Sequence, residues 1–219
     1  MATPSKSVPG EVSIPRAWFR TVEADGVGIF YREAGPADGP VVLLLHGFPS
    51  SSHMFRELSP RLATRYRVMA PDLPGFGFTG VPEERDYKYS FDALARTVEA
   101  FVNGLGLEHY ALYVFDYGAP VGYRLAVAHP ERVTAIVSQN GNADEEGLGE
   151  SWAPTRRYWS TPSAGNREVV RRSILTFAGT YCQYADGVPS PESIARNRIP
   201  QTRHCSNGLV LRRSSWICS

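Results

Sequence analysis

The sequence predicts an α/β fold built on a mostly parallel β-sheet with helices on both of its faces. Residues 41–47, VVLLLHG, form a continuous apolar run that ends in glycine, which is typical of a strand buried on both sides. Strand-like and helix-like segments then alternate along the chain, which is the order that produces a parallel sheet. No internal repeat or low-complexity stretch interrupts this alternation.

The composition indicates a soluble globular protein and narrows the classes of function. The chain has 219 residues, of which 42% are hydrophobic and 21% charged, and its net charge is +1. This length suits one domain, and the small net charge favours neither nucleic acid nor an anionic membrane as a partner. No signal peptide or membrane span is predicted. Three cysteines, Cys182, Cys205 and Cys218, form no disulfide framework, so a reduced, cytoplasmic protein is expected.

The first elements can be followed in chain order. Residues 1–16 are predicted to be a loose tail, and WFRTVEADGVGIFYREAG alternates around Asp25-Gly26, which predicts a β-hairpin. YRVMAPDLPGFG is expected to be a strand that closes in a Pro/Gly turn. Between the strand at 41–47 and this one, helical spacing is seen in Met54, Phe55, Leu58 and Leu62.

The next elements lead to an acidic residue at a turn. Ser90 can cap a helix whose apolar face consists of Leu94, Val98, Phe101, Val102 and Leu105. HYALYVF is a predicted strand that ends at Asp116, a helix follows over Val121–Ala128, and VTAIVSQN is another strand. After Asn142, SWAPTRRYWSTPS and NREVVRRSILTF are predicted to be helical, and no further strand is predicted.

Two stretches together resemble the α/β-hydrolase family. They are LLLHGFPSSSHMFRELSPRLATRYRVMAPDLPGFGFT (43–79) and YVFDYGAPVGYRLAVAHPERV (113–133). The resemblance is to the branch with an aspartate nucleophile, which contains epoxide hydrolases and haloalkane dehalogenases. It implies a hydrolase core over residues 17–142 and part of a helical lid over residues 143–195.

In that branch the nucleophile sits on a sharp turn between a strand and a helix, which is the place of Asp116. The resemblance implies that Asp116 attacks a small molecule with an electrophilic carbon and forms an alkyl ester, which a histidine-activated water then cleaves. The backbone N–H groups of Phe48 and Tyr117 would form the oxyanion hole. No cofactor or metal is implied. Taken alone, Asp116 could equally be the N-cap of the following helix.

The residues beside the nucleophile favour one substrate over another. Dehalogenases of this branch hold the halide with a tryptophan after the nucleophile, commonly helped by asparagine or another tryptophan, and here those places hold Tyr117 and Phe48. An epoxide hydrolase is therefore favoured, with a haloalkane or haloacid dehalogenase and a non-enzymatic truncated pseudoenzyme as alternatives. The resemblance also offers Tyr158, Tyr181 and Tyr184 as acids toward the epoxide oxygen, although all three can equally be packing residues.

Several other polar residues are interpreted as structural. His46 belongs to the geometry of the HGFP loop, Asp72 to a turn, and His129 to a helix end where a cation complements the dipole. Val114 replaces the small residue that the family carries two positions before the nucleophile.

The sequence lacks the residues that the resemblance implies for the second step of the reaction, the hydrolysis of the ester. The family's catalytic histidine lies near the carboxyl terminus, none of the five histidines is so placed, and the position after VTAIVSQ holds Asn140 instead of an acid. We therefore expect the last strands to be missing and the chain not to turn over. Residues 196–219 contain five Arg, no acid and no strand or helix period, and a shifted reading frame can yield lid-like sequence there. We interpret them as an aberrant, unstructured tail, with a natural short isoform as the alternative, and leave the oligomeric state open.

Overall fold

The structure of the protein, a computed structural model, describes residues 16–191 and residue 194. Apart from Arg16, the predicted amino-terminal tail over residues 1–16 lies outside the described residues. The predicted aberrant tail over residues 196–219 lies outside them entirely.

The described residues form a mixed, mostly parallel six-stranded sheet, which confirms the predicted fold class. The strand order is β1-β2-β4-β3-β5-β6. The hairpin strands β1 and β2 are antiparallel, as are β2 and β4, whereas β3 pairs in parallel with β4 and β5, and β5 with β6. The strands are β1 (Ala17–Ala24), β2 (Val27–Ala34), β3 (Val41–Leu45), β4 (Arg67–Pro71), β5 (Tyr110–Phe115) and β6 (Val133–Gln139).

The predicted hairpin is confirmed, and its turn is as short as its sequence requires. Ala24 pairs with Val27, so only Asp25 and Gly26 remain between the strands. Both have positive φ angles, 55° and 70°. Two-residue turns of this hand match the right-handed twist of the strands, and Asp-Gly is among the pairs that adopt them most readily.

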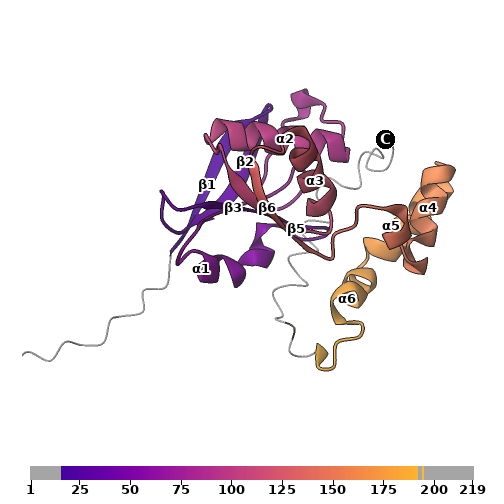
Figure 1. Cartoon of the computed structure of the whole chain (residues 1–219). Coiled ribbons are helices and arrows are strands. Elements are labelled where there is room, and N and C mark those ends of the chain that lie inside the picture. The colour runs from indigo at the N-terminus through magenta and orange to yellow at the C-terminus, as the bar shows by residue number, and fades with distance from the viewer. Residues whose placement is uncertain (1–15, 192–193, 195–219) are drawn as a thin grey trace, which may run out of the picture.

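Helices cover the two faces of the sheet in separate layers. Figure 1 shows α2 and α3 above the sheet and α1 below it. The remaining helices, α4 to α6, follow β6 and lie to one side of these layers. The α-helices are α1 (Leu58–Leu62), α2 (Phe91–Gly104), α3 (Gly118–Ala128), α4 (Ala153–Ser160), α5 (Ala164–Ile174) and α6 (Phe177–Ala185). Short 3₁₀ turns are η1 (Ser52–Phe55), η2 (Glu83–Arg85), η3 (Glu145–Gly147) and η4 (Glu150–Trp152).

The helix expected after Ser90 is confirmed with its cap. The Ser90 hydroxyl accepts the backbone N–H of Ala93 at 3.1 Å. Of the predicted apolar face, Leu94, Val98, Phe101 and Val102 are buried, whereas Leu105 is the C-cap residue and is half-buried. The helical spacing before β4 is instead realised as two pieces, η1 and α1. Pro60 explains the break, because a proline lacks the N–H and its ring clashes with the preceding turn, so it is tolerated only in the first turn of α1.

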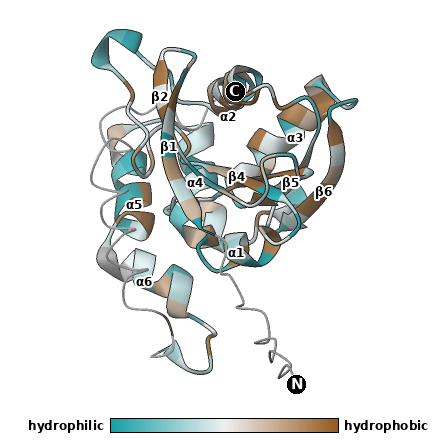
Figure 2. Cartoon of the chain, turned by 90° about the vertical axis from the view of Figure 1, so that its left-hand side faces the viewer, coloured by the Kyte–Doolittle hydropathy of each residue, from teal (hydrophilic) through white to brown (hydrophobic). Residues whose placement is uncertain are grey.

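The strand β6 lies at the edge of the sheet with little cover on its faces. Ile136 is 45% and Val137 53% exposed, and Figure 2 shows hydrophobic stretches along β6 at this edge. No described strand pairs with its outer side. An uncharged strand with free backbone groups is a template for further pairing, so the described sheet ends on an open edge, as the sequence predicts.

Among the described helices, none combines the length and the apolar character that crossing a membrane requires.

Candidate active site

The turn between β5 and α3 places an acidic side chain at the carboxyl end of the parallel strands. β5 ends at Phe115 and α3 begins at Gly118, so only Asp116 and Tyr117 lie between them. Asp116 has a φ of 49°, and its carbonyl oxygen accepts the N–H of Ala119 at 2.9 Å. A residue other than glycine in this left-handed region costs on the order of 1–2 kcal/mol. Such a strained strand-to-helix turn is the form of a nucleophile elbow.

Two glycines, Gly47 and Gly118, allow neighbouring segments to pack closely around the turn at Asp116. A Cβ atom on Gly47 would lie 2.3 Å from the Cβ of Asp116, and one on Gly118 would lie 2.1 Å from the carbonyl oxygen of Leu45. Gly122 makes room for the larger Val114, because a Cβ there would lie 2.5 Å from a methyl carbon of that valine. Val114 is larger than the residue of the family pattern, and Gly122, one turn into α3, leaves space for it.

Two backbone N–H groups converge on one oxygen of Asp116. The N–H groups of Phe48 and Tyr117 each donate to Oδ1 at 2.7 Å. The structure therefore brings together the three residues named as nucleophile and oxyanion donors. The N-cap alternative for Asp116 is wrong, because the N-cap of α3 is Tyr117 and the carboxylate binds the two N–H groups above, not those of the first helical turn.

The carboxylate of Asp116 is half-buried, and only one of its oxygens accepts hydrogen bonds from the described residues. Burial raises the pKa of Asp116, and the hydrogen bonds from Phe48 and Tyr117 lower it again in part. Within the described part of the chain, Oδ2 accepts no hydrogen bond. A lone pair on this second oxygen is therefore available for attack on a carbon atom. Burial also raises the pKa of the Tyr117 phenol, which consequently stays protonated and able to donate.

His46 and Asp72 have their polar atoms engaged in the loop framework. The Nδ1 of His46 donates to the carbonyl oxygen of Gly47 at 3.0 Å, and Nε2 accepts the N–H of Leu73 at 2.9 Å. Burial lowers the pKa of this histidine. The two carboxylate oxygens of Asp72 accept the N–H groups of Ser52 (2.7 Å) and Phe78 (2.9 Å). These contacts fix the two loops that flank Asp116 and leave no imidazole nitrogen of His46 for catalysis.

The other histidines of the described chain do not bind Asp116 either. His109 precedes β5 at the opposite end of that strand, and His129 caps the far end of α3, where its Nε2 pairs with Glu99 at 2.6 Å. At about 1.5 Å per helical residue, the eleven residues of α3 separate His129 from the elbow by roughly 16 Å. No imidazole among the described residues forms a hydrogen bond with Asp116.

The three tyrosines proposed from the resemblance differ in their surroundings. Tyr158 on α4 is buried, Tyr184 on α6 is half-buried, and Tyr181 on the same helix is 43% exposed. None of the three donates a hydrogen bond to Asp116.

Two aromatic residues beside the elbow, Phe76 and Phe91, were not predicted from the sequence as part of the site. The ring of Phe91 lies 5.1 Å from that of Tyr117, and the ring of Phe76 lies 6.2 Å from it, measured between centroids. Phe76 follows β4 in PGFGF and Phe91 starts α2, so the two come from different loops at the same edge of the sheet. The only sequence signal is that Phe76 directly follows a turn glycine after β4 and that Phe91 directly follows the N-cap residue of α2.

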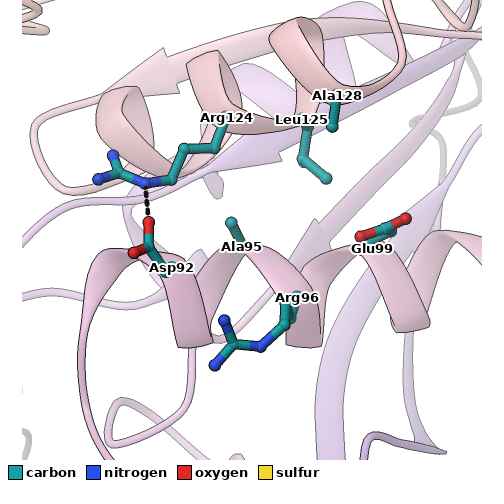
Figure 3. A pocket seen from close by; sticks show the side chains of 7 residues that line it. All are labelled: Asp92, Ala95, Arg96, Glu99, Arg124, Leu125 and Ala128. Atoms are coloured by element: carbon teal, nitrogen blue, oxygen red, sulfur yellow. Dashed lines mark hydrogen bonds and ion pairs between the residues drawn. The ribbon is translucent and has the colours of Figure 1, made fainter.

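A shallow pocket elsewhere on the surface offers no alternative site. It lies between α2 and α3, where Asp92 pairs with Arg124 (Figure 3). Its other acid, Glu99, pairs with His129, so both of its carboxylates have partners. Among the residues that the structure describes, no cluster of His, Cys, Asp and Glu is arranged to hold a metal ion.

Similarity to known proteins was found at three levels. A family profile for the alpha/beta hydrolase fold matches residues 40–170. The uncharacterized hydrolase YNR064C of Saccharomyces cerevisiae is 51% identical over 175 residues, which are 78% of this chain and 59% of the yeast protein. A haloalkane dehalogenase of Mycobacterium marinum is 39% identical over 112 residues, 51% of this chain and 37% of that protein. The chain thus spans less than two thirds of the length of these relatives.

Solved structures give the same result. The crystal structure of Cfl2 from Burkholderia cenocepacia superimposes with a TM-score of 0.71 at 25% identity, over 86% of this chain and 65% of that one. The haloalkane dehalogenase DatA from Agrobacterium tumefaciens superimposes with a TM-score of 0.67 at 27% identity, over 86% and 62%. The profile covers more than half of the chain, and the elbow and its two N–H donors occupy the places that the motifs predict. The chain therefore belongs to the α/β-hydrolase fold family, in the branch of enzymes that resemble haloalkane dehalogenases and epoxide hydrolases.

Proposed function

We propose that this chain carries the alkylation half of an aspartate-nucleophile hydrolase that acts on epoxides. The observation that supports it is the position of Asp116 in a left-handed elbow, with Oδ1 bound by two backbone N–H groups at 2.7 Å and Oδ2 unbound. The two N–H groups orient the carboxylate and leave its second oxygen as the nucleophile.

The proposed step balances without a cofactor. Oδ2 of Asp116 attacks a ring carbon of the epoxide, the carbon–oxygen bond breaks, and the electron pair moves to the epoxide oxygen, which takes a proton from an acid or from water. The product is a 2-hydroxyalkyl ester of Asp116. Tyr158, Tyr181 and Tyr184, which lie on helices α4 and α6, are proposed as the source of that proton. We propose α4 to α6 as part of the lid over the site.

The ester should persist on the described chain. Hydrolysis needs a general base, which contributes typically 10²–10⁴-fold. His46 has both nitrogens engaged, and His129 is paired at the far end of α3. We propose Phe48 and Tyr117 as the oxyanion donors of the hydrolytic step, and no described imidazole forms a hydrogen bond with Asp116.

A haloalkane substrate is the second candidate, and one observation favours it. Named bacterial relatives at 37–41% identity are haloalkane dehalogenases. In that reaction the same oxygen attacks carbon and the halide leaves with the bonding electrons. The side chains of Tyr117 and Phe48 carry no indole or amide donor for the leaving group, which supports the epoxide as the first candidate.

Intact-mass spectrometry separates the two candidates. We expect incubation of the chain with a terminal epoxide to add the mass of the whole epoxide, once per chain, in the peptide containing FDYGAP. A haloalkane would add the mass of the alkyl group without the halogen. Adducts from the haloalkane alone would favour the dehalogenase, and turnover without any adduct would contradict the proposed loss of the base.

The rate of adduct formation should depend on pH through Asp116. Only the ionised carboxylate is nucleophilic, and burial raises the pKa of Asp116 above its usual value of 3.8. The rate should therefore fall as the pH is lowered through a midpoint above 3.8 and be flat at higher pH. The measurement is the initial rate of mass addition across the acidic range, after subtraction of the rate found with Asp116→Asn. A rate that rises toward low pH would contradict an ionised nucleophile.

A further inference from the structure

Four aromatic side chains form one connected group beside the elbow, which we call the aromatic wall: Phe48, Phe76, Phe91 and Tyr117. The rings of Phe48, Phe76 and Phe91 lie 5.6, 6.2 and 5.1 Å from that of Tyr117, between centroids. Phe48 and Phe76 also contact each other, at 6.3 Å and 80°. These distances and the mostly edge-to-face angles are those of favourable aromatic pairs.

The wall is tied directly to the reacting carboxylate. Two of its members, Phe48 and Tyr117, are the residues whose N–H groups bind Oδ1 of Asp116. Their rings are therefore attached to the same two residues whose backbone N–H groups orient the carboxylate of Asp116. Phe76 is 2% exposed and contacts the rings of His46, Phe48 and Tyr117, so it is the buried member of the wall.

Three of the four residues of the wall are only partly buried. Phe48, Phe91 and Tyr117 are half-buried, as is Asp116 itself. The wall contains no charged side chain; the guanidinium of Arg124 lies over the ring of Phe91 at 5.9 Å and marks one end of it. Because the backbone N–H groups of Phe48 and Tyr117 bind Oδ1 of Asp116, we expect a substrate carbon at Oδ2 to lie beside these two residues of the wall.

We infer that this site selects electrophiles that carry an aryl group close to the reacting carbon, an inference that rests on the proposed function. An aryl ring gains edge-to-face contacts with the wall that a saturated ring of the same size cannot make, because only the aryl ring has a negative face and a positive edge. The ester forms as described above, with the ring as a binding group that takes no part in bond making.

The test compares two epoxides of matched shape, benzyloxirane and cyclohexylmethyloxirane. The methylene group separates the ring from the epoxide in both, so the reacting carbons have similar intrinsic reactivity. With the full chain we expect the aryl compound to form the Asp116 adduct about tenfold faster at equal concentration, the size expected of two aromatic contacts. Equal rates, or a faster cyclohexyl compound, would overturn the inference and leave the proposed function standing.

Substitutions of single residues test whether the preference for the aryl epoxide depends on the aromatic wall. Phe91→Leu removes one ring and should reduce the ratio of the two rates to about threefold, because one aromatic contact is lost, whereas Phe91→Tyr keeps the ring and should keep the ratio. Phe78→Leu is the matched control, since Phe78 is 73% exposed and its ring contacts Phe30, outside the wall. An unchanged ratio in Phe91→Leu, or an equal loss in Phe78→Leu, would overturn the role of the wall.

A second measurement separates failure of this inference from failure of the proposed function. If neither epoxide forms an adduct, the proposed function is wrong, and the binding of the two product diols then decides the inference. Tighter binding of 3-phenylpropane-1,2-diol than of 3-cyclohexylpropane-1,2-diol, weakened by Phe91→Leu, would support an aryl site without alkylation. Equal binding of the two diols would overturn it.

Discussion

Replacing Asp116 by asparagine should abolish adduct formation with an epoxide, lowering its rate by at least about 100-fold. The amide oxygen of asparagine carries no charge and is a poor nucleophile, whereas it can still accept the N–H groups of Phe48 and Tyr117 that now bind Oδ1. The fold should therefore be kept while the chemistry is lost. The measurement is the rate of mass addition to the intact chain, with far-ultraviolet circular dichroism as a check on folding.

The matched control is Asp38→Asn, which changes an exposed carboxylate in the turn between β2 and β3 and should leave the rate unchanged. An adduct that persists in Asp116→Asn, or that maps to a peptide without residue 116, would show that another side chain is the nucleophile. Loss of the adduct in both variants would indicate a general effect of net charge and not a reaction at the elbow.

Local patterns in the sequence were enough to predict most of the described fold. Asp25-Gly26 predicts its hairpin because a two-residue turn needs positive φ angles at both positions. Ser90 predicts the start of α2 because its hydroxyl accepts an N–H of the first turn. The elbow was located because a motif links it to the HGFP loop, although 68 residues separate Phe48 from Asp116. In each case the deciding interactions are short in sequence or carried by a recognisable motif.

Features that depend on packing between distant segments could not be predicted in this way. The aromatic wall joins residues of three loops and a helix start, and nothing local in PGFGF or SFDAL indicates that Phe76 and Phe91 meet Tyr117. The differing burial of Tyr158 and Tyr181 likewise depends on how α4 to α6 pack, since all tyrosines in a polar helical segment look alike in sequence. The break before α1 was foreseeable from Pro60, but helical spacing alone does not reveal it.

Gly118→Ala should strongly destabilise the described fold. The new Cβ would lie 2.1 Å from the carbonyl oxygen of Leu45 and 2.6 Å from its carbonyl carbon, which are backbone atoms of the central strand β3. Because a strand backbone cannot swing aside as a flexible side chain can, α3 must move away from the sheet. We expect the free energy of unfolding to fall by about 3 kcal/mol, toward the upper end for an overpacked core. With a typical dependence on denaturant, the urea midpoint would fall by about 1.5 M.

The control for this prediction is Gly104→Ala, in which the same methyl group meets nothing within 4 Å at the end of α2. Alanine is favoured over glycine in a helix by roughly 0.5–1 kcal/mol, so this variant should be as stable as the parent chain or slightly more so. If the two variants shifted the urea midpoint equally, the close approach of α3 to β3 would not be a requirement of the fold. Because Gly118 begins the helix that follows Asp116, the proposed nucleophile, the displaced α3 should also move the N–H of Tyr117 away from Oδ1. The rate of adduct formation should then fall even at urea concentrations where Gly118→Ala is still folded, whereas Gly104→Ala should react at the parent rate.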